Sequence, residues 1–180
     1  SMSFPNPNDG GPLHIRAFKD KVYAAAPWYA NGFSYTAEWT QLTGWQPSFG
    51  LQGDTYKNIS GLERIDSLLF FCGHFSHLST MYSPCVASWS GTHLYGYGDG
   101  MSTGSIVSIV RRVKKIDNKI FAVGQIDNAN GASIPGVNLG IVELSNNNTW
   151  CIYDNVFDNA VSDIVEYNND KIICGPFRKI

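Results

Sequence analysis

The residues of this chain that could bind a ligand gather in short polar segments that follow apolar runs. Aromatic side chains offer flat faces to a sugar ring, and polar side chains exchange hydrogen bonds with its hydroxyls. We therefore predict a site for a glycan or a protein segment on these loops, although solvation alone would also explain their polarity. The candidate residues are Trp28, Tyr29, His74, His77, Gln125, Asp127 and Arg178.

Patterns for catalysis are weaker than those for binding. A glycosidase needs two carboxylates roughly 5 to 10 Å apart, and no local motif pairs any two of the carboxylates here. The sequence contains no G-x-S-x-G motif, no P-loop and no G-x-G-x-x-G motif. His74 and His77 have a spacing that suits a metal on a helix, but they fall in a loop. We expect no catalytic residue, no metal and no cofactor, and an enzyme is the less favoured class.

The only basic cluster joins Arg111-Arg112 to Lys114-Lys115. Alternate residues of a strand face opposite sides, so we expect this cluster to divide between two faces and to lie on a solvated outer surface. The formal net charge of the whole chain is −2. Generic electrostatic binding to nucleic acid is therefore not expected.

The elements that must position these residues repeat along the chain. The runs LLFFCGHF (68–75), IFAVGQI (120–126) and KIICGPF (171–177) share a glycine, and the three glycines are 51 residues apart (124 − 73 = 51 and 175 − 124 = 51). A weaker copy, VYAAAPW (22–28), precedes them, with Ala26 lying 47 residues before Gly73 (73 − 26 = 47). A fixed period near fifty is typical of propellers and other repeat arrays.

Each repeat has the pattern of four short antiparallel strands. Two apolar strands are joined by a polar turn rich in Asp and Asn, which tolerate the positive φ of tight hairpins. A polar loop, a third strand, a Gly or Asn turn and a more polar fourth strand follow. The predicted hairpin turns are 19–21, 66–67, 117–119 and 168–170. No segment longer than ten residues keeps a helical period, so little or no helix is expected.

The second repeat resembles the blades of kelch-like and galactose-oxidase-like propellers. The resemblance lies in FFCGHF (70–75), VASWSGTHL (86–94) and YGYGDGM (95–101): a strand ending in glycine, a strand ending in tryptophan, a Gly-Thr turn and a glycine-rich exit. The third repeat has Glu143-Leu144 where Trp89 would fall, and the double glycine of kelch blades is absent. The resemblance implies the architecture and no particular function.

The predicted fold class is thus all-β and propeller-like, with about three and a half four-stranded antiparallel blades and a period near 50 residues. Residues 1–12 form a tail whose Ser1-Met2 is typical of a cloning scar, and residues 13–180 form the repeat domain. Its units are 13–58, 59–106, 107–160 and a half unit, 161–180.

The half unit leaves a strand edge and an apolar face without a neighbour. The tail could supply a strand, a second copy of the chain could close the ring, or the chain could be part of a longer protein. Pro5, Pro7 and Pro12 make the tail a poor strand. Closure by a homodimer is the preferred interpretation.

The cysteines indicate a compartment only weakly. Cys72 and Cys174 each end an apolar run, and none of the four cysteines forms a C-x-x-C pair, so buried reduced thiols are expected. The first residues lack the basic and apolar regions of a signal peptide. No apolar stretch approaches the roughly 18 residues of a membrane span. These features slightly favour a cytoplasmic protein without a membrane partner.

Three functional hypotheses follow. The first is a non-catalytic binding or scaffold module that holds a protein, a glycan or another copy of itself, through its loops or through the edge of the half unit. The second is a carbohydrate-active hydrolase or lyase with carboxylates paired across blades. The third is a structural subunit of a viral or other large assembly. A cleft with two close carboxylates, one with a raised pKa, would favour the enzyme.

Overall fold

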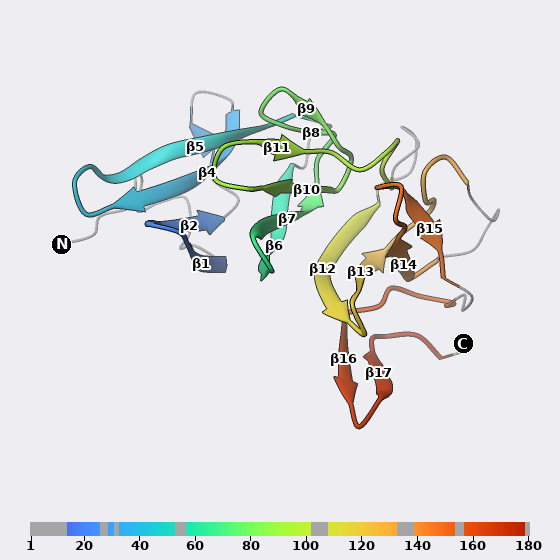
Figure 1. Cartoon of the computed structure of the whole chain (residues 1–180). Coiled ribbons are helices and arrows are strands. Elements are labelled where there is room, and N and C mark those ends of the chain that lie inside the picture. Colours follow the sequence, from blue (N-terminus) through green and yellow to red (C-terminus); the bar gives the residue numbers. More distant parts are fainter. Residues whose placement is uncertain are drawn as a thin grey trace.

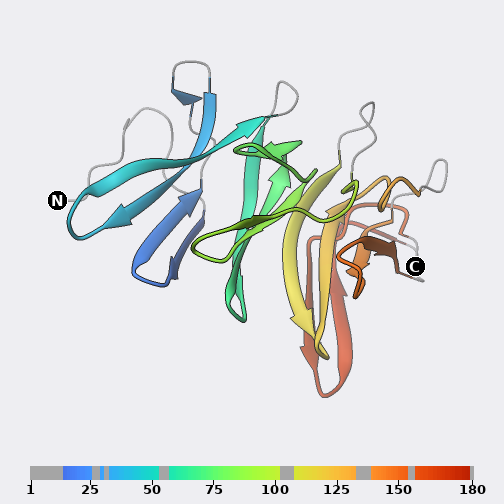
Figure 2. The same ribbon diagram turned by 45° about the horizontal axis from the view of Figure 1, so that its top comes forward.

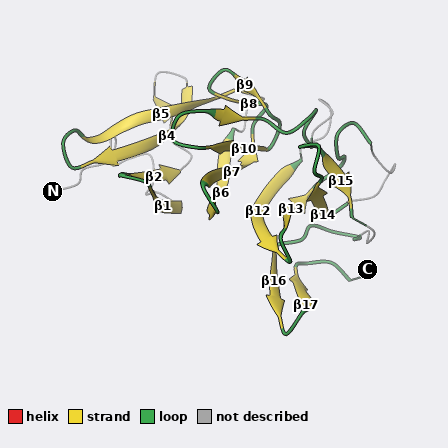
Figure 3. Cartoon of the chain, viewed as in Figure 1, coloured by secondary structure: helices red, strands yellow, loops and turns green. Residues whose placement is uncertain are grey.

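The chain is all-β, as predicted. The computed structural model describes residues 14–25, 29–30, 33–52, 57–101, 108–132, 139–153 and 157–178. These residues form strands, turns and loops and contain no helix (Figure 3). Accordingly, nothing in this part of the chain is a helix long and apolar enough to cross a membrane. The strands form four antiparallel sheets that follow one another across the molecule in chain order (Figures 1 and 2).

The second and third sheets each contain four strands in sequence order. The second sheet contains β6 (Asn58–Ile65), β7 (Leu68–His74), β10 (Val86–Trp89) and β11 (Leu94–Tyr95). The third contains β12 (Ile109–Ile116), β13 (Lys119–Gln125), β14 (Ile141–Leu144) and β15 (Trp150–Ile152). Each strand pairs antiparallel with the next strand of its sheet, which is the four-strand unit that the repeat predicts.

The first sheet is larger than the repeat predicts. Its main strands are β1 (His14–Phe18), β2 (Lys21–Ala25), β4 (Phe33–Thr40) and β5 (Gly44–Gln52), and β3 (Tyr29–Ala30) pairs with β4. Two short strands from the second repeat, β8 (His77–Leu78) and β9 (Met81–Tyr82), extend it. Leu78 pairs with Leu51. A loop of the second repeat is therefore tied to the sheet before it.

The fourth sheet is the hairpin of β16 (Asp163–Tyr167) and β17 (Asp170–Cys174). Its turn residues, Asn168 and Asn169, have φ of 50° and 66°, and the matching turn of the third sheet has 50° at Asp117 and 64° at Asn118. Two consecutive residues with positive φ define the type I′ turn that suits the twist of a hairpin. The predicted Asp and Asn turns are thus confirmed at these positions.

The repeated glycine makes room for a β-bulge in the first strand of the repeat. The register shifts between Ile59 and Gly61 in β6, and between Val110 and Arg112 in β12. One strand position before each bulge, a backbone carbonyl presses against the repeated glycine. A Cβ would lie 2.1 Å from the Asn58 oxygen at Gly73, 2.0 Å from the Ile109 oxygen at Gly124 and 2.4 Å from the Ala160 oxygen at Gly175. Only glycine fits such an approach.

Three apolar clusters fill the spaces between successive sheets. Phe18 and Tyr23 of the first sheet pack with Phe71 of the second. The cluster between the second and third sheets includes Phe70 and Trp150, and the one between the third and fourth sheets includes Phe121 and Ile164. Each sheet is therefore held chiefly by its neighbours along the chain.

Among the described residues, one face of the fourth sheet has no such apolar cluster against it. Tyr167 is 64% exposed and Ile172 is 49% exposed, while Ile116 and Phe121, which lie 51 residues earlier (167 − 116 = 51 and 172 − 121 = 51), are 3% and 0% exposed. Tyr167 and Ile172 thus occupy positions that are buried between sheets elsewhere in the chain. The end face, as we call the surface of Val165, Tyr167, Ile172 and Cys174, is open.

The open end face also corrects the prediction that Cys174 is buried. Cys174 and Cys151 are exposed, whereas Cys72 and Cys85 are buried, and all four thiols are free. Burial raises the pKa of the Cys72 and Cys85 thiols to about 12. The run before Cys174 is apolar like the others, but no sheet of the described residues covers its side chain.

Candidate functional site

The first strands of the four sheets, β1, β6, β12 and β16, lie in contact with one another in sequence order. A row of alternating charges crosses three of them. The Arg16 guanidinium in β1 lies 3.3 Å from the Glu63 carboxylate in β6, and that carboxylate lies 3.9 Å from the Lys114 ammonium in β12. These partly exposed pairs contribute little to stability, but they show that the first strands of the sheets are neighbours.

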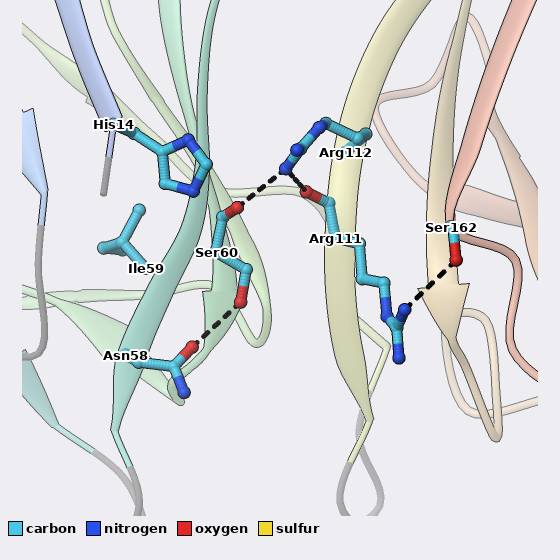
Figure 4. A pocket seen from close by; sticks show the side chains of 7 residues that line it. All are labelled: His14, Asn58, Ile59, Ser60, Arg111, Arg112 and Ser162. Carbon is cyan, nitrogen blue, oxygen red and sulfur yellow. Dashed lines mark hydrogen bonds between the residues drawn. The ribbon is translucent and has the colours of Figure 1, made fainter.

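A pocket of about 430 Å³ opens along the first strands of the sheets (Figure 4). Its lining combines two arginines, a histidine, two serines and an amide with one apolar side chain. The residues are His14, Asn58, Ile59, Ser60, Arg111, Arg112 and Ser162. They come from the first three sheets and, with Ser162, from the position that directly precedes β16, so the packing of the sheets builds this pocket, which we call the central pocket.

The β-bulges bring polar side chains into the central pocket. Ser60 and Arg111 are the extra residues of the bulges in β6 and β12, and they are 51 residues apart (111 − 60 = 51). Ser162 follows after another 51 residues (162 − 111 = 51), and its N–H donates to the Cys174 carbonyl at 2.7 Å. A bulge interrupts the alternation of a strand and redirects a side chain. The bulges therefore supply side chains to the pocket from the second and third sheets, and Ser162 adds one at the equivalent position of the fourth repeat.

Hydrogen bonds to neighbouring sheets hold both arginines. The Arg112 guanidinium donates through Nη1 to the carbonyls of Ser60, at 2.9 Å, and Arg111, at 2.8 Å. The Arg111 guanidinium donates through Nη1 to Ser162 Oγ at 3.1 Å. Figure 4 shows Arg112 directed toward β6 and Arg111 directed toward Ser162. The two guanidinium groups thus bridge three sheets.

The central pocket is positively charged. None of its lining residues is a carboxylate, and none of the ion pairs between described residues uses Arg111 or Arg112. Burial lowers the pKa of His14, and the positive charges of Arg112 and Arg16 lower it further, so the imidazole is neutral at pH 7. The arginines therefore carry the charge of the pocket, and hydrogen bonds to neutral oxygens leave that charge uncompensated.

The residues predicted from the loops lie outside this lining. Trp28 and the side chain of Tyr29 are outside the described residues. His74 is buried at the end of β7, where it pairs with Asn58 of the pocket wall, and the exposed Gln125 pairs with Ile109. Two of the predicted residues thus lie on strands that adjoin pocket strands.

The remaining predicted residues are further apart in the fold. The half-buried His77 ring contacts Ser76 Oγ at 2.9 Å and packs against the Tyr82 ring with centroids 5.2 Å apart. Arg178 is exposed, and its backbone N–H donates to Asp158 at 2.7 Å. In the described part of the chain, no hydrogen bond or ion pair joins two of the predicted side chains. The predicted loop site remains a prediction.

Asp127 has the environment expected of a carboxyl group that could exchange a proton. Burial raises its pKa, and its Oδ2 has no hydrogen-bond partner among the described atoms. The neighbouring Asn128 is buried with both side-chain polar atoms unpaired. Asp127 does not line the central pocket, however. Among the described residues, it belongs to no group of three or more His, Cys, Asp or Glu side chains that could hold a metal ion.

Sequence reasoning missed the central pocket because it assigned Arg111 and Arg112 to an outer surface. Strict alternation would put them on opposite faces, but the bulge at Arg111 lets both line one pocket. The usable signal was the common spacing of Ser60, Arg111 and Ser162. Comparison with family models, curated proteins and solved structures finds no match for this chain.

Proposed function

We propose that this chain is a non-catalytic binding module with a propeller-like arrangement of sheets, and that its central pocket receives one unit of a glycan. The observation that carries the proposal is the pocket itself, which joins two arginines of β12 to hydroxyl, amide and imidazole side chains from neighbouring parts of the fold. A volume of about 430 Å³ falls within the range of small-ligand sites.

The propeller-like arrangement is supported by three features. Successive meander sheets follow one another, their first strands are adjacent, and apolar clusters lie between neighbouring sheets. Blades of a propeller meet in this way around a central axis. The kelch-like resemblance of the second repeat agrees with this arrangement and adds no function.

Binding is favoured over a carbohydrate-active enzyme with paired carboxylates by the composition of the pocket. Hydrolysis of a glycoside needs an acid and a second carboxylate on either side of the scissile bond. No carboxylate belongs to the described lining, and the carboxyl with the raised pKa, Asp127, lies elsewhere. Hydrogen-bond donors without a pair of carboxylates are suited to holding a sugar without hydrolysing it.

A glycan array tests this proposal. The labelled chain is expected to retain one class of glycan, and the retained glycan should be recovered intact after prolonged incubation with the protein. Chromatography of the sugar would detect cleavage. Retention of no glycan would contradict the proposal, and a new reducing end or an unsaturated product would replace it with the enzyme.

We also propose that a second copy of the chain covers the end face. At each interface between successive sheets, one sheet contributes the face that is equivalent to the end face. The next sheet contributes its opposite face. Ile15 is 45% exposed in the first sheet, whereas its equivalents Leu62 and Val113 are 2% and 1% exposed. The end face of one copy and the Ile15 face of another therefore offer the two halves of an interface that the chain already contains.

Light scattering on a sizing column tests this second proposal. The chain is expected to have about twice its mass of 19.9 kDa at high concentration, and Ile172→Glu should restore the single mass because it places a charge in the apolar contact. Leu42→Glu is the matched control, since Leu42 is 94% exposed and lies outside the end face. A single mass for the original chain at every concentration would overturn the proposal.

A further inference from the structure

We infer that the central pocket selects an acidic sugar, and that Arg111 and Arg112 bind its carboxylate. The inference rests on the proposed glycan-binding function and names the chemistry of the unit that is bound. It starts from two guanidinium groups in one pocket that lacks a compensating carboxylate.

The first step is the supply of hydrogen-bond donors. A guanidinium has five N–H donors, and the hydrogen bonds that hold each arginine use only its Nη1. Nη2 and Nε of both side chains therefore have no hydrogen-bond partner among the described residues and can bind a ligand. An arginine with two free nitrogens can hold a carboxylate through two parallel hydrogen bonds.

The second step is the fixed position of these donors. Arg112 is half-buried and its Nη1 is shared between two backbone carbonyls of adjacent strands, so the side chain is ordered before a ligand arrives. Arg111 is exposed but anchored on Ser162. Ordering in the free protein reduces the entropy that binding would otherwise lose.

The third step concerns the rest of the ligand. The Ser60 hydroxyl donates to Asn58 Oδ1 at 2.9 Å, which leaves the Asn58 amide N–H groups free to donate. Ser162 Oγ accepts from Arg111, so its own hydrogen can bond to a ligand oxygen. Neutral groups beside a charged pair match a ligand with several hydroxyls and one carboxylate, as in a uronic acid.

The experiment is a titration of the ¹⁵N-labelled chain with glucuronate, followed by NMR. Amide shifts are expected at Ser60, Arg112 and Ser162. Glucose, which has the same ring without the carboxylate, should bind at least tenfold more weakly. Sodium sulfate tests a simple inorganic anion and should also bind more weakly, because it has no hydroxyls for Asn58 and Ser162.

Variants separate the arginines from other basic residues. Arg111→Gln is expected to weaken glucuronate binding at least tenfold, while Arg64→Gln, which removes an exposed arginine of β6 outside the pocket lining, should leave it unchanged. Arg111→Lys keeps the charge but not the paired donors, and should be intermediate. Arg111 is the better target because Arg112 also bridges the backbone of two sheets.

Several outcomes would overturn the inference. They are the absence of shifts with glucuronate, equal affinity for glucose, sulfate binding as tight as glucuronate, and unchanged binding by Arg111→Gln with the spectrum of a folded protein. Retention of neutral glycans on the array together with any of these results would leave the proposed binding function standing. A failure of the array and of glucuronate would remove both.

Discussion

Replacement of Gly124 by alanine is expected to destabilise the fold by about 3 kcal/mol or more, at the upper end of overpacking effects. The added Cβ would lie 2.0 Å from the Ile109 carbonyl oxygen. That oxygen belongs to the backbone of the paired strand, so no side-chain rotation relieves the contact. Urea unfolding followed by tryptophan fluorescence would measure the change in the free energy of unfolding.

Gly50→Ala is the control for this experiment. A Cβ at Gly50, in β5, would meet no atom within 4 Å. The change in stability there should stay within about 1 kcal/mol, because alanine alters the backbone entropy and little else. If Gly124→Ala and Gly50→Ala were equally stable, the repeated glycine would be dispensable. The bulged strand would then be able to shift away from a Cβ at this position.

Truncation of Phe121 is expected to cost about 3–5 kcal/mol, the usual range for a buried phenylalanine. Phe121 is fully buried between the third and fourth sheets, and its ring packs edge-on against Tyr153 with centroids 5.4 Å apart. Its equivalent in the last sheet, Ile172, is 49% exposed. Ile172→Ala should therefore cost less than about 1 kcal/mol when copies of the chain are kept apart by dilution.

Chemical denaturation at low protein concentration would measure both variants. A large effect of Ile172→Ala in a dilute, single-copy sample would mean that the chain itself covers the end face. A small effect in the dilute sample that grows with protein concentration would agree with a second copy as the cover. A small effect of Phe121→Ala would contradict the packing between the third and fourth sheets.

The repeat predicted the strands of the fold better than it predicted the site. Spacing of the glycines and of the Asp and Asn turns was sufficient for the hairpins, because both signals are local. The pairing of β8 with β5 was not predictable, since it joins two repeats through β8, a strand of only two residues. Whether the sheets form a propeller stays a proposal.

The central pocket could not be predicted from the sequence for a physical reason. It depends on bulges, which shift a strand by one residue and leave no change in composition. Ser60 and Ser162 have no special local pattern, and His14 to Ser162 span most of the chain. The exposure of Cys174 could not be predicted either, because the burial of this side chain depends on a neighbouring sheet and not on its own strand.

The one-sided support of the fourth sheet has a consequence for how the pocket opens. Its hairpin packs on the third sheet by one face only, so its amides should exchange with solvent through local opening more readily than those of β7 or β13. Ser162 adjoins this hairpin, and opening would carry it away from Arg111. The wall of the pocket that separates most easily is therefore also a route of entry, and a ligand held there would slow amide exchange across the last hairpin.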